Sequence, residues 1–251
     1  MRRILVTADD FGLTDGVTRG IVETMTRGIV TSTSAMMAAE GAPERVARAA
    51  PSVARRIGLH LQLTGGHACA SPAEVATLCG SDGEFPCHRP PAGTLDPAHV
   101  AREWAAQAAR FASLGLVPDH LDSHHHVHHR PDALEAFVRV AAAVPCPCRG
   151  GAAGVRHALR SAGLNCPDRL ESGWRDLSVE GLLRLVDRAF AAAGAGATVE
   201  LMCHPGFADE HLAACSRYVE DRERELAVLC DPATADGLRR RGIALIGWQE
   251  L

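Results

Sequence analysis

Five histidines and one aspartate lie within eight consecutive residues near the middle of the chain, in the segment Asp122–His129. Neutral imidazole is the commonest protein ligand for divalent transition metals. In an extended segment His124, His126 and His128 would share a face, whereas in a helix His124 and His128 would do so. Under either geometry this pair points the same way, which predicts two ligands of a metal site whose third ligand comes from elsewhere. The alternative is a surface histidine loop that traps metals incidentally.

Reactive side chains also stand in or at the end of three other apolar runs. Asp9 and Asp10 close an N-terminal run, His60 lies where leucines alternate with other residues, and His204 follows a run that ends in a Pro-Gly turn. The alternation places His60 on the face opposite the leucines. Consecutive side chains of a strand diverge, so Asp9 and Asp10 can take different roles. We therefore expect one carboxylate to face a metal and the other to face a water molecule.

Two of these residues also have a purely structural interpretation. Asp10 could be the N-cap of the following helix, although Thr14 or Asp15 lies closer to the apolar periodicity of that helix. His60 on its own would more often be a hydrogen-bonded structural histidine. Reactive residues also stand at the ends of the other apolar runs, and this recurrence favours a functional role for Asp10 and for His60.

The elements that must position these residues form an alternating pattern. The sequence predicts about seven strands, mostly separated by helices. In a chain of 251 residues this pattern favours an α/β fold, a distorted (β/α) TIM-like barrel, as a single domain over residues 1–251. Active sites of such barrels lie at the C-terminal ends of the strands. The candidate residues at those ends are Asp9, Asp10, His60, His124 and His204.

Two irregular segments are expected to border this site and to contact the substrate. Thr64–Pro97 directly follows the run that contains His60, and Phe207–Tyr218 follows His204. Long irregular segments in compact domains are usually lids or binding loops.

Charge, cysteine content and hydropathy exclude several classes of protein. A net charge of −4 and an isoelectric point near 6.3, with scattered basic residues, argue against a nucleic-acid partner. No apolar run reaches the ~18–20 residues of a membrane span, and the N-terminal apolar stretch is too short for a signal peptide. Nine cysteines without a C-x-x-C pair argue against a disulfide framework or a zinc ribbon. We expect a cytoplasmic protein with reduced thiols and with neither a membrane nor a nucleic-acid partner.

One carboxylate and two imidazoles around one centre would suit a hydrolytic metal site, because they leave positions open for water and substrate. The metal would lower the pKa of its bound water to about 7 and so activate it. The second aspartate could accept the proton of that water, and His204 could protonate the departing amine or alkoxide. The residues therefore predict a metal-dependent hydrolase.

Two other functions would use some of the same residues. A metal-dependent phosphoesterase usually needs two metals ~3.5–4 Å apart and basic residues for the phosphate. The sequence offers few carboxylates here and no cluster of Lys or Arg. A non-catalytic, histidine-rich metal-binding protein would need only the histidine tract and would have no use for Asp9 or His204.

Five ordered segments resemble the YdjC-like carbohydrate deacetylases, the family that includes chito-oligosaccharide deacetylase. They are Thr7–Leu13, Gly28–Thr33, Gly58–Leu61, His120–His128 and Met202–Gly206. The likeness extends to Arg222–Leu226. The resemblance implies a distorted (β/α) barrel that hydrolyses the N-acetyl group of an acetylated amino sugar or chito-oligosaccharide.

The resemblance also implies a divalent metal cofactor, Mg²⁺ or Zn²⁺, and a ligand set. The family's ligands fall on Asp10, His60 and His124. His128 remains the alternative third ligand, because spacing alone does not separate it from His124. Zn²⁺, Mn²⁺, Fe²⁺ or Co²⁺ suits an Asp/His/His set, and Mg²⁺ with retained waters fits as well.

The same resemblance assigns the catalytic roles. The general base falls on Asp9 and the general acid on His204. Members commonly carry Asn where this chain has Thr7, a change that could alter a hydrogen bond near the metal and leaves the ligands intact. The family likeness further suggests a small-molecule acetylated sugar as substrate and a homodimer as the assembly.

Overall fold

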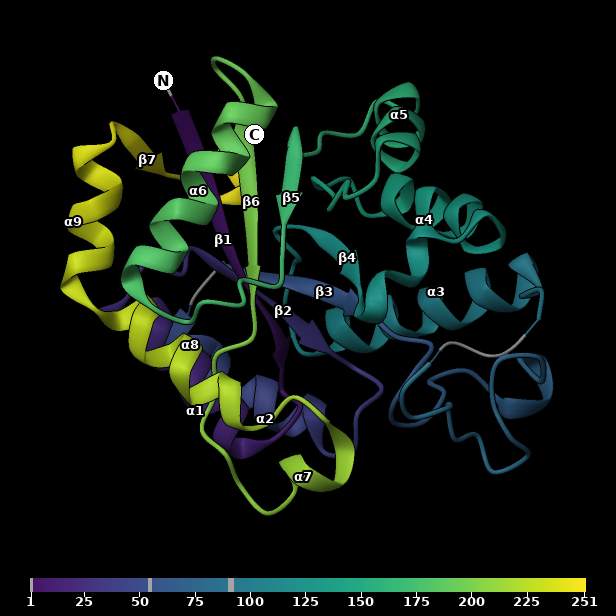
Figure 1. The fold of residues 1–251 in the computed structure, drawn as a ribbon. Coiled ribbons are helices and arrows are strands. Elements are labelled where there is room, and N and C mark those ends of the chain that lie inside the picture. The colour runs from purple at the N-terminus through teal and green to yellow at the C-terminus, as the bar shows by residue number, and fades with distance from the viewer. Residues whose placement is uncertain (1, 54–55, 90–92) are drawn as a thin grey trace.

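The computed structural model describes residues 2–53, 56–89 and 93–251, which form one parallel sheet flanked by helices (Figure 1). The strands are β1 (Arg2–Phe11), β2 (Ser32–Met36), β3 (Ile57–Leu61), β4 (Leu121–Ser123), β5 (Arg169–Glu171), β6 (Thr198–Cys203) and β7 (Ile243–Leu245). The α-helices are α1 (Asp15–Arg27), α2 (Ala42–Ala49), α3 (Pro97–Ser113), α4 (Pro131–Ala143), α5 (Ala153–Ser161), α6 (Val179–Ala193), α7 (Leu212–Cys215), α8 (Glu220–Cys230) and α9 (Pro232–Arg240). The short 3₁₀ segments are η1 (Ala50–Val53), η2 (Pro72–Glu74), η3 (His124–His129) and η4 (Trp248–Glu250).

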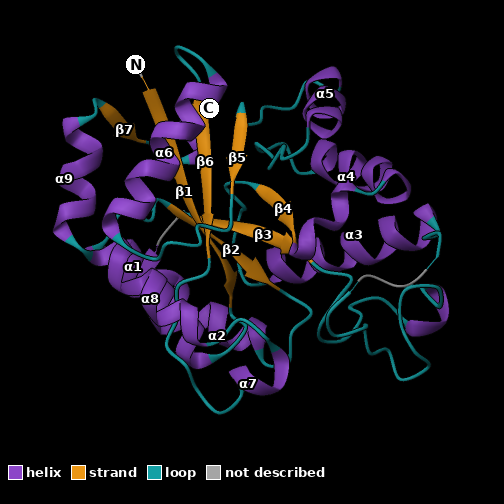
Figure 2. Cartoon of the chain, in the orientation of Figure 1, coloured by secondary structure: helices purple, strands orange, loops and turns teal. Residues whose placement is uncertain are grey.

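The sheet has the order β4-β3-β2-β1-β6-β5, and β7 pairs with the first residues of β1 on the edge that β2 occupies further along. Every pair among these strands is parallel. The sheet curls into an open half-barrel, with α1, α6, α8 and α9 on one flank and α3, α4 and α5 on the other (Figure 2). The seven strands formed by the described residues confirm the expected distorted barrel.

The strands at the centre of the sheet are apolar because helices cover them. From Ile4 onward β1 is buried, and β6 is buried throughout. Near-continuous apolar runs are typical of strands in parallel sheets that are covered on both faces. Because the strands are parallel, their C-terminal ends meet at one edge of the sheet, which is where the candidate residues lie.

Helix α1 begins where its capping residue predicts. Thr14 is the N-cap, and its side chain accepts a hydrogen bond from the backbone N–H of Val17. Asp10 is the next-to-last residue of β1 and therefore does not serve as the cap. The structural interpretation of Asp10 as an N-cap is wrong, and its carboxylate is left for another role.

The histidine tract is neither extended nor α-helical. It forms the 3₁₀ segment η3, in which His125 and His126 adopt left-handed backbone conformations with φ of 53° and 52°. Such conformations are uncommon for residues with a Cβ and are found where the surrounding structure enforces them. They separate the directions of side chains that a regular strand or helix would align, so His124 and His128 do not share a face.

The C-terminal residues pack against β1 and against the residue that precedes β4. The buried Trp248 ring stacks on His120, with centroids 4.3 Å apart and an interplanar angle of 7°. Its indole N–H donates to Oγ1 of Thr7 over 3.1 Å. The hydroxyl oxygen of Thr7 is therefore hydrogen-bonded to the C-terminal segment. Within the part of the chain described here, no helix combines the length and apolarity needed to cross a membrane.

The tight packing of Gly58 generates a stability prediction. A Cβ on this β3 residue would lie 2.3 Å from Cε1 and Nδ1 of His120, whose ring is held by Trp248. We expect Gly58→Ala to lower the free energy of unfolding by about 1–3 kcal/mol, because the overpacked core must shift. Urea unfolding measures this change. Gly154→Ala in α5 is the control, since a Cβ at that position would have nothing within 4 Å, and it should lose no stability.

Candidate metal and catalytic site

Asp10 presents a buried carboxylate oxygen without a hydrogen-bond partner. Its backbone is left-handed, with φ of 72°. Oδ2 accepts a hydrogen bond from Nη2 of Arg222 over 2.6 Å, whereas Oδ1 is buried and has no donor among the described residues. Burial alone would raise the pKa of Asp10, but Arg222 and the neighbouring histidines hold it well below its usual value. A buried, ionised oxygen without a donor is the feature expected of a metal ligand.

Two imidazole nitrogens face this oxygen. Nε2 of His60 lies 3.7 Å and Nε2 of His124 lies 3.9 Å from Oδ1 of Asp10. Nδ1 of His60 is 2.7 Å from Oδ1 of Asp122, and Nδ1 of His124 is 2.8 Å from Oγ1 of Thr64. An outer partner on Nδ1 leaves Nε2 for a metal, as it does for most metal-binding histidines. The three ligands that the resemblance implies, Asp10, His60 and His124, therefore face one another.

The protonation of the two histidines differs. Burial lowers the pKa of His124 to about 3, so its ring is neutral, which is the form that binds metals. Burial would also lower the pKa of His60, but the carboxylates of Asp122 and Asp9 outweigh it and raise the pKa to about 9. A cation that binds Nε2 of His60 would therefore displace a proton.

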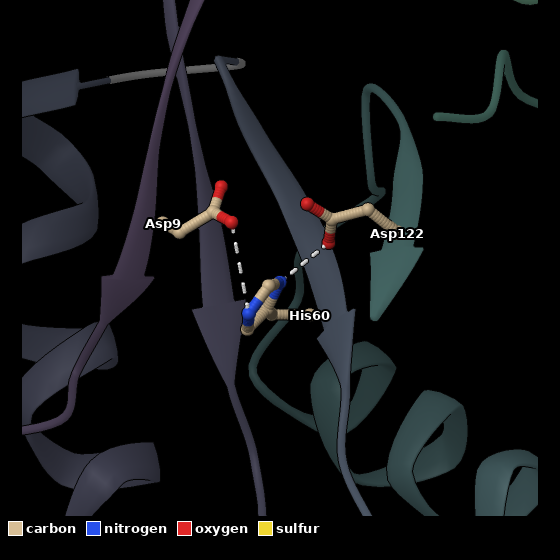
Figure 3. A group of neighbouring side chains, drawn as sticks. All are labelled: Asp9, His60 and Asp122. Atoms are coloured by element: carbon tan, nitrogen blue, oxygen red, sulfur yellow. Dashed lines mark hydrogen bonds and ion pairs between the residues drawn. The ribbon is translucent and has the colours of Figure 1, made fainter. Parts of the chain in front are cut away.

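A second group of potential ligands shares His60 with the first. Asp9, His60 and Asp122 offer ligand atoms that all lie within 4.8 Å of one another (Figure 3). The carboxylates of this group are already engaged, however. Oδ2 and Oδ1 of Asp9 accept hydrogen bonds from Arg149 over 2.7 and 2.8 Å, and Oδ2 of Asp122 lies 2.6 Å from Nη1 of Arg149. Oδ2 of Asp122 accepts no hydrogen bond either, but it is paired with the Arg149 guanidinium, whereas Oδ1 of Asp10 has neither a hydrogen bond nor a guanidinium partner among the described residues. Asp10 is therefore the better candidate ligand.

Arg149 is the main site residue that the sequence did not identify. Its side chain is buried, and it also binds Oε1 of Glu200 over 2.8 Å. Burial would raise the pKa of Asp9, but the Arg149 guanidinium outweighs it and lowers that pKa. Asp9 is therefore an ionised carboxylate in a fixed orientation, as a proton acceptor needs to be.

His204 stands at the end of β6, beside the end of β1. The pairing of Ala8 with Cys203 makes Asp9 and His204 the next residues on neighbouring strands. The backbone N–H of His204 donates to Oε2 of Glu225 over 2.5 Å, and the imidazole lies 5.6 Å from the Tyr218 ring. The general acid expected from the sequence is thus at the same edge as the candidate ligands.

His128 has a different environment from His124. It is fully buried, its Nδ1 is 2.5 Å from Oγ of Ser123, and its Nε2 is 3.2 Å from the carbonyl oxygen of Arg149. Its ring also stacks on Phe137 at 4.5 Å. Both ring nitrogens are occupied, so the geometry favours His124 as the third ligand.

This difference predicts contrasting effects of two substitutions. His124→Ala should weaken Zn²⁺ binding by more than the roughly 10–100-fold typical of losing a residue that only orients a ligand, with little loss of stability. His128→Ala should instead lower the free energy of unfolding by about 2–4 kcal/mol, because it empties a packed, hydrogen-bonded site. Calorimetric Zn²⁺ titration and urea unfolding measure the two effects. Equal loss of Zn²⁺ affinity in both variants would contradict the assignment.

Known proteins are similar to this chain over nearly its whole length. The family model described as "YdjC-like protein" matches residues 3–240. A carbohydrate deacetylase of Geobacillus stearothermophilus is 36% identical over 99% of this chain and 98% of its own length. A chitooligosaccharide deacetylase of Yersinia pestis (strain Pestoides F) is 33% identical over 96% of both chains.

A solved structure shares the fold as well as the sequence. The crystal structure of a proposed cellobiose-phosphate cleavage protein from Enterococcus faecalis V583 superposes with a TM-score of 0.88 at 31% identity, covering 99% of this chain and 98% of the other. The match of the family model to most of the chain confirms the resemblance found in the sequence. This chain belongs to the YdjC-like family.

Proposed function

We propose that this protein is a metal-dependent deacetylase that hydrolyses the N-acetyl group of an acetylated amino sugar or chito-oligosaccharide. The observation that carries the proposal is the unpartnered, buried Oδ1 of Asp10, which faces Nε2 of both His60 and His124. The names of the relatives, carbohydrate deacetylase and chitooligosaccharide deacetylase, support the substrate class and the bond that is broken.

Asp10, His60 and His124 would hold the cation. When bound, a divalent cation would supply Lewis-acid chemistry that polarises the acetyl carbonyl and acidifies water. Nδ1 of His60 is tied to Asp122, Nδ1 of His124 to Thr64, and Oδ2 of Asp10 to Arg222, so all three proposed ligands have fixed orientations. Preorganised ligands of this kind avoid reorganisation during the reaction.

Asp9 would act as the general base. Both of its oxygens are held by Arg149, and Oδ1 also accepts from the hydroxyl of Ser34 over 3.3 Å. The lowered pKa of Asp9, set by Arg149 against the effect of burial, keeps the carboxylate ionised and able to take the proton of the attacking water. Arg149 thus sets both the orientation and the charge of the base.

His204 would act as the general acid. Water adds to the acetyl carbon, the C–N bond breaks, and the amine nitrogen leaves as a poor leaving group unless it is protonated. His204 stands across the β1–β6 pair from Asp9 and could deliver that proton. The products are acetate and the free amino sugar.

The first loop predicted to contact the substrate begins at the site. Oγ1 of Thr64 lies 2.8 Å from Nδ1 of His124 and 3.0 Å from Nδ1 of His125. The expected loop Thr64–Pro97 includes positions 90–92, which lie outside the described residues. Its contact with the exposed His125 supports a role at the mouth of the site.

The alternative functions fit the site less well. Among the described residues, Arg149 and Arg222 contact the carboxylates of the site, and they are engaged by Asp9 and Asp10 respectively. A phosphoesterase would need such cations for its substrate. A simple metal-binding protein would not need the buried pair of Arg149 and Asp9.

The proposed reaction predicts acetate release. Purified protein loaded with Zn²⁺, or with Mg²⁺, should release acetate from N,N′-diacetylchitobiose, and excess chelator should abolish the release. An enzymatic acetate assay with parallel detection of the free amine measures both products. Metal-dependent phosphate release from sugar phosphates without any acetate release would favour the phosphoesterase instead.

The division of roles between the adjacent aspartates predicts different losses. Asp9→Asn should keep its metal and lose roughly 10²-fold or more in kcat, because only the base is removed. Asp10→Asn should lose the metal itself, because a ligand is removed. Metal content by plasma emission spectroscopy and kcat from acetate release distinguish the two. Equal loss of metal in both variants would show that the division is wrong.

A further inference from the structure

Two buried charged residues of helix α8 contact the candidate site. One contacts the proposed metal ligand Asp10, and the other contacts the proposed acid His204. The segment Arg222–Leu226 resembles a family motif, and the proposed reaction uses only the contact of Arg222 with Asp10, so that Glu225 has no role there. Arg222 and Glu225 are 2% and 3% exposed, although they lie on a helix whose other charged residues face solvent. The i, i+3 spacing places both on one face of the helix. Buried charges are costly and are kept where they bind specific partners.

Arg222 holds the proposed metal ligand Asp10. Its Nη2 donates to Oδ2 of Asp10 over 2.6 Å, and its Nε donates to the carbonyl oxygen of Tyr218 over 2.8 Å. The guanidinium is therefore fixed at one end to its own segment and at the other to the carboxylate. Because Oδ2 is taken, the free Oδ1 of Asp10 is the oxygen that remains towards His60 and His124.

Glu225 holds the proposed acid His204. Its Oε2 accepts from the backbone N–H of His204 over 2.5 Å, and its Oε1 accepts from the Tyr218 hydroxyl over 2.5 Å. The Tyr218 ring in turn meets the His204 imidazole at 5.6 Å, edge to face. One carboxylate thus fixes both the backbone of His204 and the ring that contacts its side chain.

The helix is anchored where it makes these contacts. The carbonyl oxygen of Arg222 accepts from the N–H of Gly206, in the turn that follows His204, over 3.3 Å. Gly206 also packs closely on α1, since a Cβ on Gly20 would lie 2.6 Å from Cα of Gly206. Helix α8 is therefore fixed against the turn that carries His204, and small shifts of the helix would move both contacts together.

We propose that Arg222 and Glu225 are positioning residues of the proposed deacetylase, with Arg222 orienting the metal ligand Asp10 and Glu225 orienting the acid His204. This inference rests on the proposed function for the role of His204. It goes beyond that function by assigning the two roles to separate residues of one helix. A substitution of Arg222 should therefore impair metal binding alone, and a substitution of Glu225 should impair proton donation alone.

Two substrates separate these roles. Hydrolysis of N,N′-diacetylchitobiose requires protonation of an amine, whereas 4-nitrophenyl acetate releases 4-nitrophenolate, which needs no proton from an acid. Chelator-sensitive rates on both substrates, together with Zn²⁺ affinity by calorimetry, are measured for Arg222→Gln, Arg222→Lys, Glu225→Gln and Tyr218→Phe. Arg224→Gln is the matched control, because Arg224 lies on the same helix, is exposed and pairs with Asp221 at 3.2 Å rather than with a residue of the site.

Arg222→Gln should weaken Zn²⁺ binding about 10–100-fold and reduce both reactions at limiting Zn²⁺, with partial recovery in Arg222→Lys. Glu225→Gln should keep Zn²⁺ affinity within about 3-fold, lose roughly 10²-fold in kcat on the amide, and keep most of its ester hydrolysis. Tyr218→Phe should also lose kcat on the amide and keep its ester hydrolysis, with a smaller loss than in Glu225→Gln. Arg224→Gln should match the wild type.

Wild-type Zn²⁺ affinity in a folded Arg222→Gln protein would overturn the role of Arg222. Equal losses of amide and ester hydrolysis in Glu225→Gln, with wild-type Zn²⁺ affinity, would overturn the role of Glu225. If the wild-type protein releases no acetate from either substrate, the proposed function fails, and the Zn²⁺ affinities still decide the role of Arg222.

Discussion

The burial of ionised groups at the C-terminal edge of the sheet is the constraint on which the rest of the site depends. Carboxylates removed from water cost several kcal/mol each unless cations and hydrogen bonds compensate them. Arg149 compensates Asp9, Asp122 and Glu200, and Arg222 compensates one oxygen of Asp10. The other oxygen of Asp10 has no partner within the described part of the protein. In the proposed function, a divalent cation would be the partner of this oxygen.

The topology explains how such a cluster can form. Parallel pairing brings the ends of β1, β3, β4 and β6 to one edge, so residues far apart in sequence become neighbours. The compensating cations come from outside the strands, Arg149 from the segment after α4 and Arg222 from α8. The strands and the residues that directly follow them thus supply the acids and imidazoles, and the surrounding segments fix their charge and orientation.

The parts of the site that the sequence predicted are those with local signals. An apolar run followed by Asp9 and Asp10, and a period-two run around His60, are readable because strand geometry decides the direction of each side chain. The N-cap Thr14 is equally local. The resemblance of these segments to family motifs then predicted the fold and the reaction.

The parts that were missed depend on tertiary contacts. Arg149 follows a Cys-Pro-Cys segment with no regular period, and only its bonds to Asp9 and Glu200 reveal its role. The choice between His124 and His128 required the left-handed turn at His125 and the packing of His128 on Phe137. No periodicity encodes such a turn, because a left-handed residue with a Cβ is imposed by its surroundings.

The central claim is that Asp10, rather than Asp9 or Asp122, shares the cation with His60 and His124. A crystal structure of the Zn²⁺-loaded protein, with anomalous data collected at the zinc edge, tests it most directly. We expect one anomalous peak about 2.0–2.2 Å from Oδ1 of Asp10 and from Nε2 of His60 and His124, with the Arg149–Asp9 pair intact. A peak bound by Asp9 and Asp122, with Arg149 displaced, would contradict it.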